Sequence, residues 1–346
     1  MIQTTIRMRL LLGAFLLLTV LMPSLVSAQD FVRIATYNQL HGPSGTTEVN
    51  NFKTIVQGMA NENVGGRSKT LDVIAVQETN SSSLANARNA LNQLYGAGTY
   101  NTFMASYGTG IWNGFLYNTK TMNLLGTKTV SGPTRGVARL HLQAKSNTAE
   151  DFYIYSAHLK AGSGGSDQSK RFTEVNQIRS DADALGQGEN VIFTGDMNIY
   201  RSSESAYQKF LSGGNGQAFD PINRPGNWHD NSSFKDIHTQ DPSGSLGGMD
   251  DRFDFQLVSG ELLDNVGMDY IQGSYHAFGN TGLHNLNGNI TSGPAPNNTI
   301  TNALQAYSDH LPVVADYVIP TVPEPTSVLM IVSTGSLLMM RRKKAA

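Results

Sequence analysis

Short apolar runs rich in Val, Ile, Phe and Tyr alternate along the chain with segments rich in Gly, Asn and Ser. Runs of this length, bounded by turn residues, predict β-strands joined by loops. One segment differs, because its apolar residues recur at helical spacing and predict a helix over 167–185 with Ser166 as its cap. Its apolar face is predicted to consist of Phe172, Val175, Ile178, Ala182 and Leu185. The strands are predicted at 31–37, 72–77, 112–117, 136–143, 152–157, 190–194, 253–258 and 312–317.

Strands mixed with helical segments favour a layered α/β fold. Between residues 31 and 317 the chain has no internal repeat, low-complexity linker or charge block, so a single domain is expected there. With 39% hydrophobic and 15% charged residues, the composition excludes collagen, coiled coils and multi-span membrane proteins. The sequence contains no cysteine, so a bound metal must use oxygen or imidazole ligands, and a cysteine nucleophile is excluded.

The N-terminal segment is typical of a secretory signal peptide. Arg7 and Arg9 precede an apolar run over 10–22, and small residues follow it up to Ala28. A retained membrane anchor is the alternative, but a span needs about 20 apolar residues. The run here has 13. We therefore expect residues 1–28 to be a signal peptide that is removed during export.

The C-terminal segment, 322–346, resembles a PEP-CTERM sorting signal. A Pro-Glu-Pro tripeptide at 323–325 is followed by an apolar segment over 327–340 and a basic cap over 341–344. The resemblance implies processing by an exosortase-type enzyme and transient association with the inner membrane of a Gram-negative bacterium. The basic cap is expected on the cytoplasmic side. The destination is then extracellular, at the cell surface or in the exopolysaccharide matrix, and a plain C-terminal anchor is the alternative.

The charge of the chain is unevenly distributed. The whole sequence has 25 basic and 27 acidic residues, but six of the basic residues and one acidic residue lie in the two terminal segments. Residues 29–322 therefore carry a net charge of −7. A protein that holds long polyanions through phosphate neutralisation presents a basic surface. Nucleic acid, if it is the substrate, must be held locally, for example through a divalent cation.

Several predicted strands end in a carboxylate, amide or imidazole side chain. Asn38 ends the first, Glu78 the second and His158 a middle strand, whereas Asp309 and His310 precede the last. One such residue usually makes only a turn. Five strand ends of this kind in one chain predict a shared site. The fifth is the segment Asp196-Met197-Asn198.

These motifs, taken in order, resemble the endonuclease/exonuclease/phosphatase superfamily of metal-dependent phosphoesterases, over residues 31–317. The resemblance implies a deoxyribonuclease-like fold, a four-layer α/β/β/α sandwich of two packed mixed sheets with the site at one edge. The motifs that carry it are Thr36-Tyr37-Asn38, Gln77-Glu78, Ala157-His158-Leu159, Gly195-Asp196-Met197-Asn198, Arg252-Phe253-Asp254-Phe255 and Ser308-Asp309-His310.

The chemistry of a phosphoester assigns roles to these residue types. In-line attack of water requires shielding of the phosphate charge, activation of the water and neutralisation of the leaving oxygen. We expect Glu78 to be the principal ligand of Mg²⁺ or Mn²⁺, with Asn38 and Asp309 completing a hydrated shell of oxygen ligands. Ca²⁺ is a further candidate ion.

The remaining motif residues are expected to handle protons and the phosphate. Asp254 should orient His310 and raise its basicity. Asp196 and Asn198 are predicted on one face of a short extended segment, where Asn198 donates to the phosphate and Asp196 orients water or holds a second ion. His158 should bind the phosphoryl oxygen or protonate the leaving group. Whether Asp196 or His310 is the general base stays open.

Two positions depart from, or only partly fit, the deoxyribonuclease branch. That branch has a Glu before the strand at 112–117 that supports the middle histidine, whereas residues 111–114 of this chain contain no acid. A carboxylate partner for His158 is therefore in doubt. Arg135 falls where that branch places an arginine that contacts the phosphate. The side chain of Arg135 could contact the phosphate or could be solvated, and the sequence leaves both alternatives open.

The segments 220–242 and 248–251 contain further polar and aromatic residues that could line a substrate groove. We expect Trp228 to serve packing, and we expect the same of His276 and His284. The catalytic prediction does not include them.

The sequence predicts an exported, divalent-metal-dependent phosphoesterase, with an extracellular nuclease as the leading form. A nuclease would need Arg135, Lys160, Lys170 and Arg171 to cluster near the site. A lipid or inositol phosphoesterase of the sphingomyelinase kind is the alternative, although residues 31–317 contain no apolar run for membrane contact. A non-catalytic surface or matrix protein would have degraded motifs. The oligomeric state is not predicted.

Overall fold

The computed structural model describes residues 30–105 and 111–320. The predicted signal peptide at 1–28 and the predicted sorting signal at 322–346 lie outside the described residues. Among the residues that are described, no helix has the length and apolar character needed to cross a membrane.

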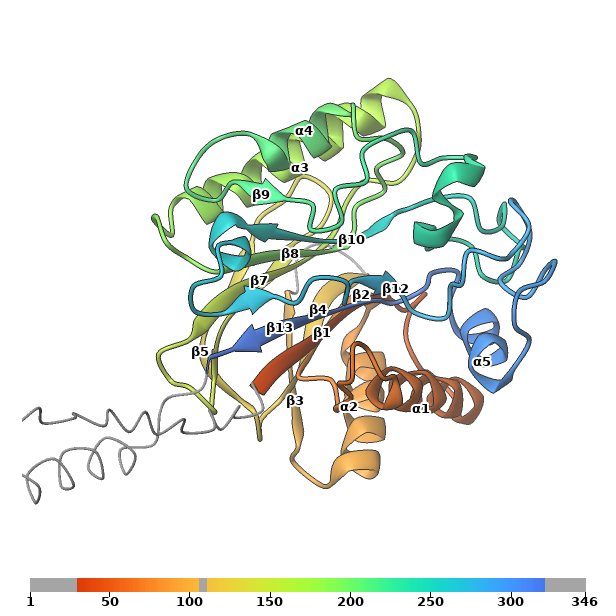
Figure 1. The fold of residues 1–346 in the computed structure, drawn as a ribbon, viewed down its shortest axis with the longest axis horizontal. Coiled ribbons are helices and arrows are strands. Elements are labelled where there is room, and N and C mark those ends of the chain that lie inside the picture. The colour runs from red at the N-terminus through yellow and green to blue at the C-terminus, as the bar shows by residue number, and fades with distance from the viewer. Residues whose placement is uncertain (1–29, 106–110, 321–346) are drawn as a thin grey trace, which may run out of the picture.

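Two mixed β-sheets pack face to face at the centre of the molecule (Figure 1). In the first sheet the order is β11-β13-β1-β2-β4-β3, with β12 also paired to β13. β1 and β2 run parallel, and the other paired strands of this sheet are antiparallel. Its strands are β1 (Asp30–Asn38), β2 (Val73–Thr79), β3 (Tyr100–Ala105), β4 (Trp112–Asn118), β11 (Asp269–Tyr270), β12 (His276–Ala277) and β13 (Val313–Ile319).

The second sheet has the order β5-β6-β7-β8-β10-β9. Only β7 and β8 are parallel among its described pairs, which mirrors the β1–β2 pair of the first sheet. Its strands are β5 (Met122–Val130), β6 (Val137–Ala144), β7 (Asp151–His158), β8 (Val191–Asp196), β9 (Ala218–Phe219) and β10 (Asp254–Ser259).

Helices cover the outer face of each sheet, so the molecule has four layers (Figure 1). α1 (Thr46–Asn61), α2 (Ser81–Tyr95) and α5 (Thr299–Tyr307) lie on the first sheet, whereas α3 (Gly165–Asp183) and α4 (Ser205–Leu211) lie on the second. Two short 3₁₀ turns, η1 (Ser232–Ile237) and η2 (Gly260–Leu263), lie in the loops around β10.

Neighbouring strand residues serve different layers because side chains alternate across a sheet. Ile34 packs into the core between the sheets, and Ala35 packs under the helices of the first sheet. Likewise Ile154 faces the central core and Tyr155 faces α3. The central strands are therefore buried on both faces, which explains why they appear in the sequence as continuous apolar runs rather than alternating ones.

The predicted four-layer sandwich of two mixed sheets is confirmed, and each predicted strand overlaps an observed strand. The predicted helix is α3, but two details of it were wrong. Gly164 is the N-cap and Ser166 lies inside the helix. Phe172 is 41% exposed, and the buried face includes Arg171 and Glu174. The inward side of α3 faces loop carbonyls as well as the apolar core, and arginine can satisfy those carbonyls.

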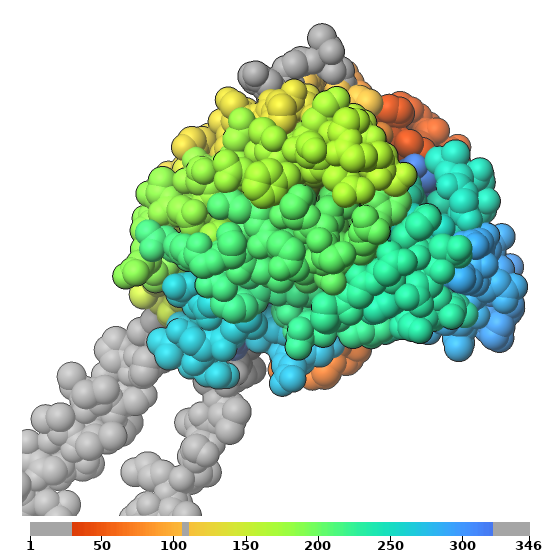
Figure 2. All heavy atoms as spheres, turned by 90° about the horizontal axis from the view of Figure 1, so that it is seen from above, coloured from red at the N-terminus to blue at the C-terminus, as the bar shows by residue number. Residues whose placement is uncertain are grey.

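Loops longer than simple turns gather at one end of the sandwich. Figure 2 shows teal residues of about 230–250 and blue residues of about 285–310 together at that end, whereas the cyan residues of about 260–275 lie at the other end. The C-terminal ends of β1 and β2 lie side by side because these strands are parallel, and so do those of β7 and β8. The hydrogen bond from Asn38 to Asp196 shows that the two pairs of ends meet at the same edge. Any site built on these strand ends therefore lies under the long loops.

A buried ion pair fixes one of these loops to the second sheet. Arg252 is fully buried, and its Nη1 and Nη2 atoms donate to the carboxylate of Asp220 at 2.7 and 3.0 Å. The guanidinium also donates to Tyr275 Oη and lies over the rings of Trp228 and Phe255. Burial alone would raise the pKa of Asp220, but Arg252 outweighs it and lowers that pKa. Trp228 therefore serves packing, as expected.

We expect Asp220→Asn to destabilise the fold by about 3–5 kcal/mol, because it leaves the Arg252 charge buried without a counter-ion. Urea unfolding at neutral pH measures this loss. Asp236→Asn is the matched control, since Asp236 binds Arg224 through two oxygens on the surface and an exposed pair contributes at most about 1 kcal/mol. Equal losses in the two variants would contradict the structural role of the buried pair.

Candidate active site

Strand register brings the predicted site residues to one edge of the sandwich. Asn38 ends β1 opposite Gln77 of β2, and His158 ends β7 opposite Asp196 of β8. Asp254 begins β10 directly across from Asp196. The side chains that were predicted from five separate strand ends therefore converge from both sheets.

Hydrogen bonds between polar side chains hold the two sheets together just below this edge. Gln77 Nε2 donates to Ser156 Oγ at 2.9 Å, and Ser156 Oγ donates to the Val76 carbonyl at 3.0 Å. Both side chains are buried. Because β2 and β7 belong to different sheets, these bonds fix the distance between the two halves of the site.

The carboxylate of Asp196 lies at the centre of the site. Asn38 Nδ2 donates to Asp196 Oδ2 at 3.0 Å, and His158 Nε2 and His310 Nε2 lie 3.3 and 3.6 Å from the same oxygen. Burial raises the pKa of Asp196, with further contributions from Asp254 and opposition from His310. One carboxylate oxygen is thus surrounded by three nitrogen-bearing side chains from both sheets.

His310 and Asp254 form a buried pair. His310 Nδ1 lies 2.8 Å from Asp254 Oδ2, and Gln240 Nε2 lies 3.3 Å from His310 Nε2. Burial alone would lower the pKa of His310, but the carboxylates of Asp254 and Asp196 outweigh it and raise the pKa to about 10. The imidazole is therefore cationic at neutral pH in the absence of other ligands, and Asp254 fixes its orientation.

His158 has the opposite electrostatic situation. Burial lowers its pKa well below the ordinary value, and the charges of Arg135 and His310 add to this effect. Its Nδ1 atom is buried without a hydrogen-bond partner among the described residues and lies 3.9 Å from Glu78 Oε1. The imidazole is neutral, so the two histidines of the site differ in charge.

The carboxylate nearest to the Nε2 atom of His158 is Asp196, on the neighbouring strand. The segment 111–114, which contains no acid, includes Asn113, whose amide donates to the Gly136 carbonyl. Arg135 Nη1 donates to the carbonyls of His158 and Leu159 at 3.3 and 3.4 Å. Arg135 thus binds the backbone that carries His158.

Three oxygen-bearing side chains form the candidate metal centre. Glu78 has a φ of 51°, a left-handed backbone that is uncommon for Glu and turns its side chain at the end of β2. Asn38 Nδ2 donates to Glu78 Oε1 at 3.2 Å. Asp309 Oδ1 is buried with no partner among the described residues, and burial followed by the charge of Glu78 raises the pKa of Asp309. Carboxylate and amide oxygens with an unsatisfied buried atom fit a hard divalent cation.

Asn198 does not lie in an extended segment, and that expectation was wrong. Its φ is 51°, and its backbone N–H donates to Asp196 Oδ1 at 3.1 Å. Its Nδ2 atom donates to the Leu159 carbonyl at 3.2 Å. The chain turns sharply after β8 because the Asp196 side chain captures the N–H two residues later. Asn198 still lies within the site, where it binds the His158 loop.

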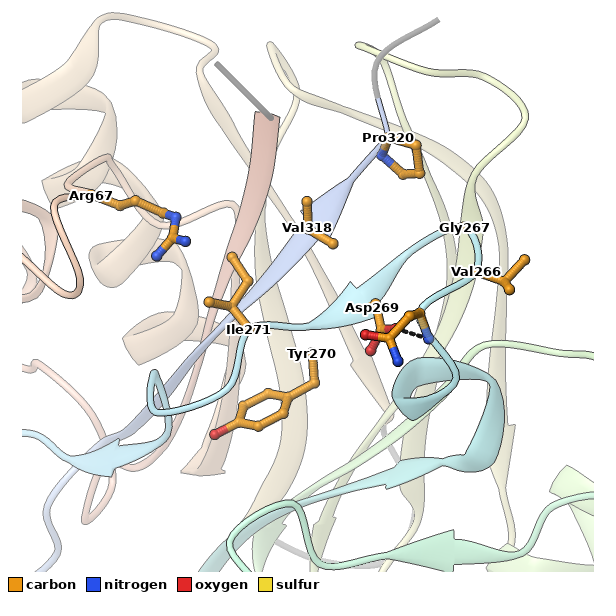
Figure 3. Close-up of a pocket in the computed structure, with 9 residues that line it drawn as sticks. Arg67, Val266, Gly267, Asp269, Tyr270, Ile271, Val318 and Pro320 are labelled. Carbon is orange, nitrogen blue, oxygen red and sulfur yellow. Dashed lines mark hydrogen bonds between the residues drawn. The ribbon is translucent and has the colours of Figure 1, made fainter. Parts of the chain in front are cut away.

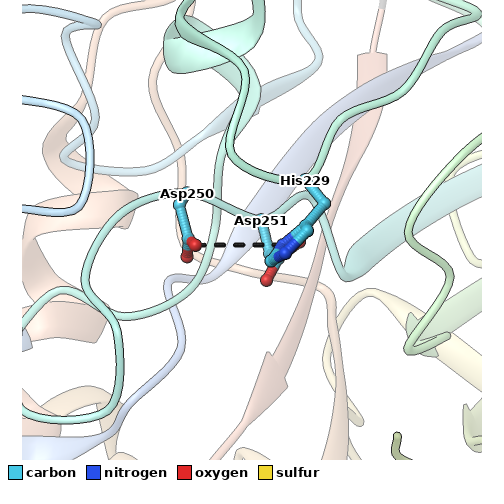
Figure 4. Close-up of side chains that lie close together, drawn as sticks. All are labelled: His229, Asp250 and Asp251. Carbon is cyan, nitrogen blue, oxygen red and sulfur yellow. Dashed lines mark hydrogen bonds and ion pairs between the residues drawn. The ribbon is translucent and has the colours of Figure 1, made fainter. Parts of the chain in front are cut away.

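A second group of possible metal ligands lies in the loops near the site. His229, Asp250 and Asp251 have ligand atoms within 4.8 Å of one another, and His229 Nδ1 lies 2.9 Å from Asp251 Oδ1 (Figure 4). Tyr200, two residues after Asn198, packs edge-on against His229. Sequence reasoning left these residues out. The combination of His229 with adjacent aspartates was the available signal.

Three of the four basic residues that a nuclease would need are engaged by other groups of the protein, Arg135 as described above, and the fourth, Lys170, is exposed on α3. Arg171 is buried, pairs with Glu204 at 2.6 Å and donates to the carbonyls of Lys160 and Gly162. Lys160 Nζ lies 3.0 Å from Asp167. These cations organise the loops behind the site and are not free to neutralise a long polyanion.

One cavity lies far from this centre along β13. It has a volume of about 620 Å³ and lies at the C-terminal end of the strand, where Val318 and Pro320 line it (Figure 3), whereas His310 precedes the strand. Arg67, Asp269, Tyr270 and Pro320 are among its lining residues. None of the predicted site residues lines it, so it is separate from the convergence at the other end.

The fold is shared with solved structures of low sequence identity. An endonuclease/exonuclease/phosphatase family protein from Bacteroides thetaiotaomicron is 16% identical with a TM-score of 0.54, and covers 84% of this chain and 96% of its own. A mannosyl-6-phosphatase from the same organism is 15% identical with a TM-score of 0.54, covering 83% and 100%. A D. rerio TDP2 humanized by 14 mutations is 14% identical with a TM-score of 0.54, covering 83% and 98%.

The sequence profile of the Endonuclease/Exonuclease/phosphatase family matches residues 35–310. The chain belongs to this family, whose members are phosphoesterase hydrolases and in general depend on a divalent metal. A comparison with curated proteins found no significant match. The resemblance to this superfamily that was drawn from the strand-end motifs is confirmed.

We expect Asp254→Asn to lower the pKa of His310 by about 1–3 pH units, because an adjacent carboxylate stabilises the cationic imidazole by that order. The sign follows from a raised pKa, since His310 keeps its proton until about pH 10 and loses it earlier without Asp254. NMR titration of the imidazole protons in metal-free protein measures this pKa. Asp251→Asn is the control because its partner is His229, and an unchanged pKa in Asp254→Asn would contradict the pairing.

Proposed function

We propose that the protein is a divalent-metal-dependent phosphodiesterase that hydrolyses its substrate by in-line attack of water. The observation that carries the proposal is the convergence of Asn38, His158 and His310 on one oxygen of Asp196. This convergence combines a carboxylate, a neutral imidazole and a cationic imidazole within hydrogen-bonding or short ionic distance. General acid–base hydrolysis needs groups in these different protonation states.

We further propose that Glu78, Asn38 and Asp309 hold Mg²⁺ or Mn²⁺. A bound divalent ion would neutralise phosphate charge and assist the leaving oxygen. The donor set of two carboxylates and one amide supports a hard ion, as does the unpartnered Asp309 Oδ1 atom. The cluster of His229, Asp250 and Asp251 is the place where we propose that Ca²⁺ or another second ion binds.

The remaining residues are proposed to bind the phosphate and move protons. Cationic His310 and neutral His158 can each donate an N–H hydrogen bond to a phosphoryl oxygen beside Asp196. Asp196 accepts the proton of the attacking water, cationic His310, oriented by Asp254, gives a proton to the leaving oxygen, and the proton held by Asp196 restores His310 after the product leaves. Asn198 and Arg135 hold the backbone of the His158 loop, which keeps that imidazole in place.

Nucleic acid is the proposed substrate class, with the acidic domain binding it locally at the phosphate. Because Lys160 and Arg171 are paired with Asp167 and Glu204, they do not offer a row of cations to a long duplex, and this supports short substrates. Residues 1–28 and 322–346 support export, processing by an exosortase-type enzyme, and an extracellular or matrix location. A lipid or inositol phosphoesterase is the competing proposal. A sugar phosphatase is a further alternative, because one of the solved structures with a similar fold is a mannosyl-6-phosphatase.

We expect Glu78→Ala to lower kcat/KM on an aryl phosphodiester with Mg²⁺ or Mn²⁺ by about 100-fold or more, since it removes the principal proposed metal ligand. The variant should stay folded, because Glu78 is partly exposed at a strand end and buries little apolar surface. Steady-state kinetics and circular dichroism measure the two effects. Glu261→Ala, which removes a carboxylate from the η2 turn, is the matched control.

The substrate is identified by assaying residues 29–321 on plasmid DNA, RNA, an aryl phosphodiester, sphingomyelin, inositol phosphates and mannose 6-phosphate. Hydrolysis that requires added metal and is lost in Glu78→Ala supports the proposal. Activity that persists in chelator, or equal activity in Glu78→Ala and Glu261→Ala, contradicts it. Inactivity on every substrate favours a non-catalytic surface protein.

A further inference from the structure

A small cavity opens beside the proposed metal centre and shares only Asp309 with it. Its volume is about 340 Å³, and Asp309 forms one of its walls. The adjoining Ser308 donates from its Oγ atom to the Asn38 carbonyl at 2.7 Å, so the cavity wall is bonded directly to the strand end that carries the metal centre. A group that is attached to a phosphate at the centre can therefore reach the cavity.

Two exposed leucines line this cavity. Leu40 is 42% exposed and Leu246 is 67% exposed, although both belong to ordered loops. Large apolar side chains at such exposure cost solvation free energy unless a ligand covers them. They come from different segments, the turn after β1 and the loop before β10, and line the same cavity as Asp309.

The backbone around both leucines is fixed by polar groups. The Leu40 N–H donates to Asn38 Oδ1 at 3.2 Å, and Leu40 has a φ of 42°, a left-handed conformation that is strained for Leu. The Leu246 N–H donates to Oδ2 of buried Asp241 at 2.7 Å, and Asp241 also accepts from Ser243. These bonds hold apolar side chains against solvent, as expected for a preformed binding wall.

The polarity of the cavity indicates what it accepts. Asp309 is its one ionisable lining carboxylate, and no Lys or Arg lines it among the described residues. A second phosphate is therefore excluded, because it would lie near an acid without a counter-ion. Ser243, Ser245 and Gln305 add hydroxyl and amide groups at the edge. Apolar walls with a few hydrogen-bonding groups suit a flat, uncharged ring with a polar edge, and the volume lies at the lower end of small-molecule pockets.

We propose that this cavity is a substrate subsite for a nucleobase-sized ring, carried on the phosphoester that the adjacent centre hydrolyses. The inference rests on the proposed function and deepens it, since it makes a nucleoside phosphodiester the substrate class. The occupied Lys160 and Arg171 side chains agree with a short substrate, because recognition by one ring replaces recognition by a row of phosphate contacts. Leu246 determines specificity and takes no part in bond cleavage.

The test compares two substrates with the same leaving group, thymidine 5′-(4-nitrophenyl) phosphate and methyl 4-nitrophenyl phosphate. Their scissile bonds are alike, and only the first carries a base. We expect the wild-type protein to prefer the nucleoside ester in kcat/KM, and Leu246→Asp to reduce that preference by about 10-fold or more through loss of apolar contact. The rate on the methyl ester should be unchanged. Leu283→Asp, at another exposed leucine outside the cavity lining, is the matched control.

A second measurement uses inhibition by thymidine 5′-monophosphate and by inorganic phosphate. Leu246→Asp should weaken only the nucleotide. Equal preference in wild type and Leu246→Asp overturns the subsite while the proposed function stands, because both esters are still cleaved. A stronger, Leu246-dependent preference for hexadecyl 4-nitrophenyl phosphate overturns the ring assignment in favour of an alkyl chain. Failure of the wild type to cleave any of these esters with Mg²⁺ or Mn²⁺ refutes both the subsite and the proposed function.

Discussion

The buried carboxylate of Asp196, at the junction of the two sheets, is the constraint on which the site depends. A carboxylate at this depth is costly unless donors surround it. Asn38 reaches it from the first sheet, His158 lies beside it on the parallel strand, and His310 approaches from the segment before β13. The sandwich must therefore keep its sheets in a fixed relation, and the Gln77–Ser156–Val76 bonds serve that purpose.

The parallel pairs β1–β2 and β7–β8 make this geometry possible. In a parallel pair both C-terminal ends lie at one edge, so polar residues that follow a buried strand face their neighbours there. A register slip of one residue would turn His158 or Asp196 to the opposite face of the sheet. The continuous apolar runs that fix these registers and the catalytic residues at their ends are thus parts of the same sequence pattern.

The same pattern explains what could be predicted from the sequence. Asn38, Glu78, His158 and Asp196 were found because each ends a recognisable apolar run. The left-handed turn at Asn198 was missed, since it depends on capture of a backbone N–H by the Asp196 side chain.

Other parts of the structure left no local signal. β5 is an exposed edge strand whose Leu124 and Leu125 face solvent, so its alternation is irregular. Contacts such as Gln240 with His310 or His229 with Asp251 join distant loops, and no spacing rule predicts them.

The most direct test of the account is a crystal structure with Mn²⁺ and a non-hydrolysable phosphorothioate diester. Anomalous density between Asn38, Glu78 and Asp309, with the phosphorus beside Asp196 and both histidines, is the predicted result. Mn²⁺ bound only elsewhere, or a diester outside this edge, would contradict it.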